Sequence, residues 1–162
     1  MALDEIPTAL RAWGQLVRAQ ATAKRELATE LQELHGLTMT AYEALFVLSR
    51  ADGQRLKRVE LAERLVLTPS GVTRLLEGLE AEGFVEKVAC ETDLRISYAQ
   101  LTAAGRTKLE QASCGHNRSI LELFEERFSP EEIEALATLL ARLPGALDED
   151  LACPTDVKPD PS

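Results

Sequence analysis

Apolar residues recur at helical spacing over most of the chain. They predict a long helix from about Thr8 to Leu34, and His35-Gly36 would end it because Gly36 suits a left-handed cap. Thr38 or Thr40 would cap a second helix. The buried side of that second helix would include Ala41, Leu45 and Leu48.

Two more helices are predicted after position 102. Thr102 would cap a helix that continues to Arg127, with Cys114 packed along it. Ser129-Pro130-Glu131-Glu132 combines a capping hydroxyl, a first-position proline and first-turn acids, which is a typical helix start. Pro144-Gly145 would end this last helix after its apolar positions Ile133, Leu136, Leu140 and Leu143.

The first and last long helices have apolar stripes that their own chain is too short to cover. A second subunit would cover them, so the pattern predicts a two-fold dimer.

The segment from Leu56 to Thr102 carries the most specific pattern. A short amphipathic helix from Val59 to Leu65 is followed, after a brief turn, by a helix that begins at Thr68-Pro69. One stripe of this second helix would face the core through Val72, Leu75, Leu76 and Leu79. The spacing predicts a helix-turn-helix.

Two extended runs follow, Phe84 to Ala89 and Arg95 to Leu101, with a projecting loop between them. The short stretch Arg55–Lys57 is expected to pair with this hairpin as a small strand. Helix, turn, helix and hairpin is the winged-helix order. The predicted fold is therefore mainly α with a small β-hairpin wing (α+β).

Short motifs in this segment resemble the MarR family of bacterial transcription regulators. The most specific is Asp-x-Arg in the wing followed by Leu-Thr-x-x-Gly, and in helix order the resemblance extends over positions 8 to 146. The motifs are Glu60-Leu61-Ala62, Val72-Thr73-Arg74-Leu75, Leu79–Val85, Asp93-Leu94-Arg95 and Leu101–Gly105.

The resemblance implies a homodimer that binds a pseudo-palindromic DNA operator, usually as a repressor released by a small molecule or an oxidant. It also implies dimerisation through the terminal helices. The expected organisation is an N-terminal dimerisation helix (1–37), a winged helix-turn-helix DNA-binding region (38–102), C-terminal dimerisation helices (103–147) and an acidic, disordered tail (148–162).

A helix of this size fits the major groove of DNA, and its free N-terminal N–H groups suit a phosphate. Arg74 can make a bidentate contact with guanine, whereas Ser70 and Thr73 can bond to phosphate or base. The alternative for Arg74 is a solvated side chain paired with Glu77 or Glu80. The candidate DNA-binding residues of this helix are Thr68, Ser70, Gly71, Thr73 and Arg74.

In the wing, Arg95 would reach the adjacent minor groove or its phosphates, oriented by Asp93. A hairpin ion pair between the two without DNA contact is the alternative. Family members generally have a second basic residue between these positions, where this chain has Leu94. We therefore expect weaker wing affinity.

Charge complicates the DNA-binding interpretation, because duplex affinity is largely phosphate neutralisation. The chain has 162 residues, 45% of them hydrophobic, and a formal net charge of -9. Positions 55–109 hold nine basic and eight acidic residues, whereas positions 110–162 hold four and twelve. The acid is concentrated away from the predicted DNA face, which is about neutral, so a moderate salt dependence is expected.

The resemblance also implies an effector pocket between the dimerisation helices and the winged helix. Trp13, His35 and Tyr42 are candidates to line it, although Trp13 also suits a core or dimer seam and His35 a helix-end cation. The other candidate input is oxidation of Cys90 at the start of the wing loop, where neighbouring Glu91 would work against thiol reactivity.

Several classes are excluded by what the chain lacks. No Ser/His/Asp set, metal-ligand spacing or phosphate loop is present, so we expect no enzyme activity, no metal and no cofactor. Without a signal peptide or an apolar run of membrane-spanning length, a cytoplasmic location is expected. The competing function is a winged-helix protein-interaction module or antirepressor with little DNA affinity.

Overall fold

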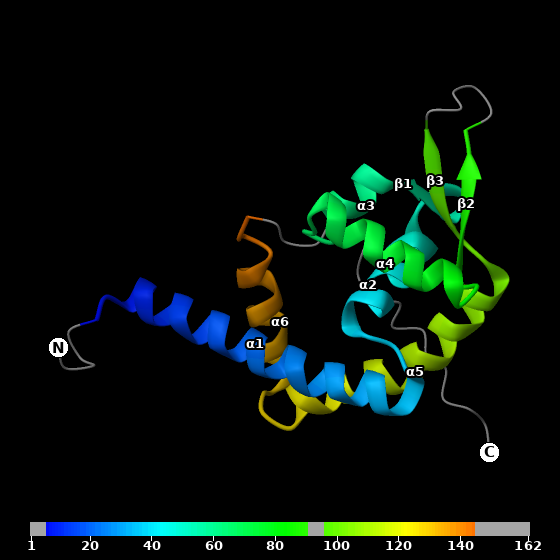
Figure 1. The fold of residues 1–162 in the computed structure, drawn as a ribbon. Coiled ribbons are helices and arrows are strands. Elements are labelled where there is room, and N and C mark those ends of the chain that lie inside the picture. The colour runs from blue at the N-terminus through cyan, green and yellow to red at the C-terminus, as the bar shows by residue number, and fades with distance from the viewer. Residues whose placement is uncertain (1–5, 91–95, 145–162) are drawn as a thin grey trace, which may run out of the picture.

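The computed structural model describes residues 6–90 and 96–144, and it is mainly helical with one small sheet (Figure 1). This confirms the predicted fold class. In chain order the elements are α1 (Thr8–His35), α2 (Met39–Arg50), a 3-10 turn η2 (Asp52–Gln54), β1 (Arg55–Lys57), α3 (Arg58–Arg64), α4 (Pro69–Ala81), β2 (Val85–Ala89), β3 (Ser97–Leu101), α5 (Ala103–Glu125) and α6 (Pro130–Leu140). The predicted disordered tail, 148–162, lies outside the described residues.

Local capping chemistry sets where the helices begin. At each of four helix starts, the capping hydroxyl accepts a hydrogen bond from the backbone N–H three residues further on. The first long helix ends at Gly36 in a left-handed conformation with φ 63°, as predicted. The four capping residues are Thr38, Thr68, Thr102 and Ser129.

The ends of the last two helices were predicted too far along the chain. α5 ends at Glu125 rather than Arg127, and α6 ends at Leu140, before Leu143. In both places the backbone tightens into three-residue hydrogen bonds, from Arg127 N–H to the Phe124 carbonyl and from Leu143 N–H to the Leu140 carbonyl. Such tightening commonly satisfies the last carbonyls of a helix.

The sheet has the antiparallel order β1-β3-β2, so the short strand before α3 does pair with the wing hairpin. Leu56 lies opposite Ala99, and Val85 lies opposite Leu101. All four side chains are buried. The inner face of the sheet therefore belongs to the core, while the β2–β3 hairpin projects beyond the helices (Figure 1).

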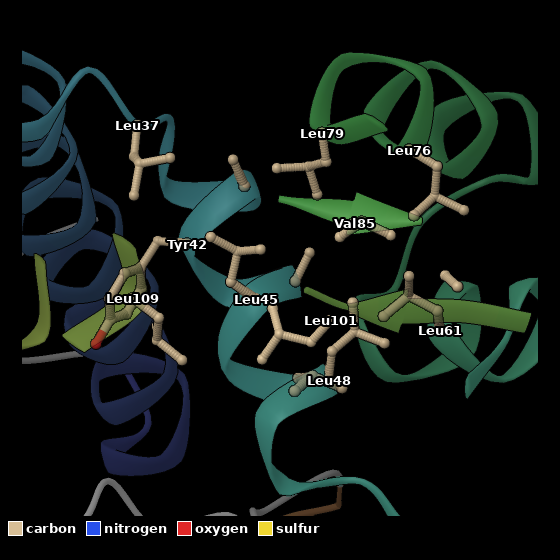
Figure 2. Packing of buried hydrophobic residues seen from close by; sticks show 14 of the residues in the cluster. Leu37, Tyr42, Leu45, Leu48, Leu61, Leu76, Leu79, Val85, Leu101 and Leu109 are labelled. Carbon is tan, nitrogen blue, oxygen red and sulfur yellow. The ribbon is translucent and has the colours of Figure 1, made fainter. Parts of the chain in front are cut away.

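The core is built around α2. Leu45 and Leu48 point from α2 toward Leu101 of the sheet, whereas Tyr42 lies on the side of Leu109 of α5 (Figure 2). One continuous cluster of buried residues includes Leu31 of α1 together with residues of α2, α3, α4, the sheet and α5. The winged helix and the long helices thus share a single core.

The outer parts of the terminal helices lack such cover within one chain. The first half of α1 extends away from the rest of the molecule (Figure 1). Its Leu10, Trp13 and Val17 side chains, which share one helix face, are 62%, 65% and 46% exposed. No residue of α6 is buried.

Candidate DNA-binding surface

Most of the backbone N–H groups at the N-terminus of α4 are already hydrogen-bonded within the chain. Thr68 Oγ1 accepts the Gly71 N–H at 3.2 Å, and the Thr68 carbonyl accepts the Val72 N–H at 3.0 Å. Pro69 has no N–H to offer. Among the described residues, only Ser70 keeps a first-turn N–H for an anion. The expected set of free N–H groups for a phosphate is therefore largely used up by capping.

Gly71 has a structural reason to be glycine. A β-carbon there would lie 3.2 Å from Thr68 Oγ1 and 3.8 Å from Leu67 Cβ, so a larger residue would press on the cap. The structure thus supports a capping role for Thr68 and Gly71, and their direct contact with DNA stays a prediction.

The two faces of α4 are clearly different. Val72, Leu76 and Leu79 are buried, whereas Ser70 and Arg74, one turn apart, are exposed on the opposite side. The alternative in which Arg74 is neutralised by Glu77 or Glu80 has no support, because no ion pair joins them among the described residues. The Arg74 guanidinium is available to a ligand.

Thr73 differs from Ser70 and Arg74 because its hydroxyl is already engaged. Its Oγ1 donates to the Pro69 carbonyl at 2.9 Å and accepts from Arg58 Nη2 at 2.7 Å. Arg58 is the first residue of α3, so this bond joins the two helices of the helix-turn-helix. Sequence reasoning counted Arg58 as a basic residue without assigning it to the site, although the run Arg55-Leu56-Lys57-Arg58 is dense in cations.

An open hollow of about 710 Å³ lies between α3 and the start of α4. Its apolar members include Val66 in the turn, which is 91% exposed and has a left-handed φ of 53°. Such a backbone is uncommon for a β-branched residue and costs free energy of about 1 to 3 kcal/mol. The hollow is lined by Arg58, Val59, Ala62, Glu63, Val66, Leu67, Thr68, Pro69, Val72 and Thr73.

In the wing, Asp93 and Arg95 lie outside the described residues, so their predicted roles stay predictions. Next to that segment, the Cys90 N–H donates to the Ile96 carbonyl at 3.0 Å and extends the hairpin ladder. Cys90 is half-buried, whereas Cys114 is exposed. The expectation that Cys114 packs along its helix is wrong, because its position on α5 faces outward.

The three candidate effector residues do not come together within one chain. Trp13 is 22 residues from His35 along α1, about 33 Å at the rise of an α-helix. Tyr42 is buried, and its hydroxyl lies 3.1 Å from Ser113 Oγ on α5. His35 Nε2 lies near Gly115 on the same helix, 3.6 Å from where a β-carbon would stand.

A residue not singled out from the sequence, His116, lies beside Tyr42 with its ring edge-on at 4.6 Å between centroids. It is buried, and within the described residues its Nδ1 has no hydrogen-bond partner. Burial lowers the pKa of His116 below its usual 6.5, although Glu30 and Glu43 act in the opposite direction. No apolar periodicity pointed to this residue.

The described residues hold no group of three or more His, Cys, Asp or Glu side chains that could bind a metal ion. In the same part of the chain, no helix is both long and apolar enough to span a membrane.

The site therefore consists of an exposed recognition helix beside a projecting hairpin, which defines a winged helix-turn-helix protein. A model of the MarR family matches residues 35–96. A crystal structure of a MarR family transcriptional regulator from Silicibacter pomeroyi has 30% sequence identity and a TM-score of 0.67, covering 88% of this chain and 97% of that one. The chain belongs to the MarR family of transcription regulators.

Two other relatives add detail. The transcriptional repressor YetL of Bacillus subtilis is 34% identical over 108 residues, which span 67% of this chain and 64% of YetL. Sco3205, a MarR family regulator from Streptomyces coelicolor solved in complex with DNA, has a TM-score of 0.74 and 25% identity, covering 83% and 84% of the two chains. Membership of this family makes the protein a transcription regulator rather than an enzyme.

Proposed function

We propose that the protein is a homodimeric repressor that binds a pseudo-palindromic operator and is released by a small-molecule effector. The observation that carries the DNA-binding part is the exposed α4 face with Arg74, next to a projecting hairpin. In a two-fold dimer, two such helices would enter successive major grooves about 34 Å apart. Chromosomal operators would place the protein in the cytoplasm.

Dimerisation is supported by the apolar side chains that one chain leaves uncovered. Leu10, Trp13 and Val17 form one exposed face of α1, and Leu139 and Leu143 are 57% and 44% exposed at the other end of the described chain. Large apolar side chains that are exposed together on one helix face are typical of an interaction site. The seam that we propose joins these parts of two copies.

Repression is supported by the name of YetL, a repressor. Release by an effector is supported by the junction of α1, α2 and α5, where Tyr42, Ser113 and His116 place polar groups inside an apolar core. The Nδ1 of His116, which has no hydrogen-bond partner in the described part of the chain, is available to a ligand that donates a hydrogen bond. Oxidative release through Cys90 stays a prediction, tested by whether Cys90→Ser still responds to peroxide.

The function is tested by fluorescence anisotropy. Labelled duplexes would be the chain's own upstream intergenic DNA, a duplex selected from a random pool by the protein, and a scrambled control, each across a salt series. Tight binding to the first two that weakens with salt is the expected result.

One observation favours the competing protein-interaction function. The net charge is -9, and α4 itself carries Glu77 and Glu80 against one cation, Arg74. An interaction module would show no duplex affinity even at low salt. That outcome would reject the regulator proposal, whereas salt-sensitive binding would reject the module.

A further inference from the structure

We propose that Thr73 is a positioning residue, which holds Arg58 so that Arg58 neutralises a DNA phosphate beside the recognition helix. This inference rests on the proposed operator binding and deepens it. It changes the role of Thr73, which the sequence placed in direct contact with phosphate or base. It also adds Arg58 as a second cation at the α4 face.

The hydroxyl of Thr73 cannot serve a phosphate in this arrangement. A threonine hydroxyl has one proton and two lone pairs. The proton goes to the Pro69 carbonyl at 2.9 Å, and one lone pair accepts Arg58 Nη2 at 2.7 Å. Phosphate oxygens only accept hydrogen bonds, so Thr73 would have to break its bond to Pro69 to reach one.

Arg58, by contrast, keeps most of its donors. A guanidinium has five N–H groups in a planar fork, and the bond to Thr73 uses one of them. Phosphate is the ligand that such a fork matches best. Because Thr73 already holds the long side chain in place, less conformational freedom is lost when DNA binds.

The position of Arg58 also offsets the net negative charge of α4. That helix carries Arg74 as its single cation and two acids, Glu77 and Glu80. The bond from Arg58 to Thr73, the residue next to Arg74, brings a second positive charge to the same helix from the start of α3. Arg58 and Thr73 also line the open hollow between α3 and the start of α4, which gives a DNA backbone room to approach.

The simpler interpretation is that the bond only ties α3 to α4. A tie affects folding stability, whereas a phosphate contact also affects the salt dependence of DNA binding. The two interpretations are separated by substitutions that remove the charge, the hydroxyl or both. Arg58→Gln removes the charge, Thr73→Val removes the hydroxyl at nearly constant shape, and Thr73→Ser retains the hydroxyl.

The experiment measures anisotropy with a duplex selected by the wild-type protein and with a scrambled duplex, across a salt series. Arg58→Gln should weaken binding to both duplexes by a similar factor, roughly tenfold. It should also lower the salt slope by about 1 for each copy of the chain. Thermal unfolding by circular dichroism checks that each variant is folded.

The Thr73 variants test the positioning role. Thr73→Val should weaken binding several-fold with the salt slope unchanged, because the Arg58 charge remains. Thr73→Ser should bind like the wild type. In the Arg58→Gln background, Thr73→Val should have no further effect, since the two residues act as one unit.

Three results would overturn the inference. They are an unchanged affinity and salt slope in Arg58→Gln, a loss confined to the selected duplex, or Thr73→Val effects that add fully to those of Arg58→Gln. If Arg58→Gln does not fold, the contrast between Thr73→Val and Thr73→Ser decides the question. Failure of the wild type to bind either duplex would instead refute the proposed function, and this inference with it.

Discussion

The backbone of Gly105 at the start of α5 lies directly against the carbonyl group of Phe84. A β-carbon at position 105 would overlap that carbonyl oxygen and approach Leu101 Cδ1 to 2.8 Å. Thr102 completes the junction, because its hydroxyl donates to the Gly83 carbonyl at 2.7 Å and its N–H donates to the Phe84 carbonyl at 3.1 Å. The Leu-Thr-x-x-Gly motif therefore fixes α5 to the point where α4 passes into the wing.

This close approach predicts that Gly105→Ala is destabilising. The added methyl group forces the α5 start away from Phe84, at a cost of about 1 to 3 kcal/mol in the free energy of unfolding. Urea denaturation followed by circular dichroism measures the change. Gly78→Ala is the matched control, because nothing lies within 4 Å of a β-carbon there, and it should gain up to about 1 kcal/mol of helix propensity. Equal stability of Gly105→Ala and the wild type would contradict the contact.

A second prediction concerns pH. Burial lowers the folded pKa of His116, so below its unfolded value of 6.5 the unfolded chain binds more protons than the folded one. Stability from this residue is complete above pH 6.5 and is lost as the pH falls from there toward the folded pKa. Unfolding midpoints measured from about pH 5 to 7.5 should therefore fall on the acid side.

The control for this effect is His116→Gln, which cannot titrate. The stability of His116→Gln should vary less with pH in the same window than the stability of the wild type. An identical pH dependence in His116→Gln and the wild type would show that other groups cause it.

The proposed dimer seam is tested through Trp13, the only tryptophan in the chain and 65% exposed in a single subunit. Its emission should be blue-shifted in the dimer and shift to the red on dissociation. Leu139→Asp, which places a charge on the exposed α6 face, should dissociate the dimer. The average mass in sedimentation equilibrium should then fall toward that of the monomer, and the emission should shift to the red. Leu139→Met retains an apolar side chain and should stay dimeric. A dimeric Leu139→Asp variant would place the seam elsewhere.

The helix starts were predictable because the chemistry that sets them is local. Thr68 accepts the Gly71 N–H, and Ser129 forms a capping box with Glu132 three residues away. The left-handed end of α1 at Gly36 is likewise set by residues close to it in the sequence. The sheet order was also predictable, since Arg55–Lys57 had no other extended partner than the hairpin.

Features that depend on how elements pack were not predictable. The bond from Arg58 to Thr73 spans 15 positions and depends on the angle between α3 and α4, which no local motif encodes. His116 is buried although it lies in a polar stretch of sequence, because the packing of α5 against α2 decides its environment. Trp13 and His35 were grouped as candidates to line one pocket, but the length of α1 places them about 33 Å apart.

The central claim is that the exposed face of α4 selects an operator through Arg74. The most direct measurement is the ratio of affinities for the selected and scrambled duplexes, determined for the wild type, Arg74→Ala and Arg118→Ala. Arg118 is an exposed cation on α5, so its removal changes the net charge equally and leaves the α4 face intact.

Arg74→Ala should reduce the difference in binding free energy between the selected and scrambled duplexes by about 1 to 3 kcal/mol for each copy of the chain. Sedimentation should show that this variant is still a dimer. Arg118→Ala should leave the free-energy difference unchanged. An Arg74→Ala variant that retains the wild-type preference for the selected duplex would contradict the account.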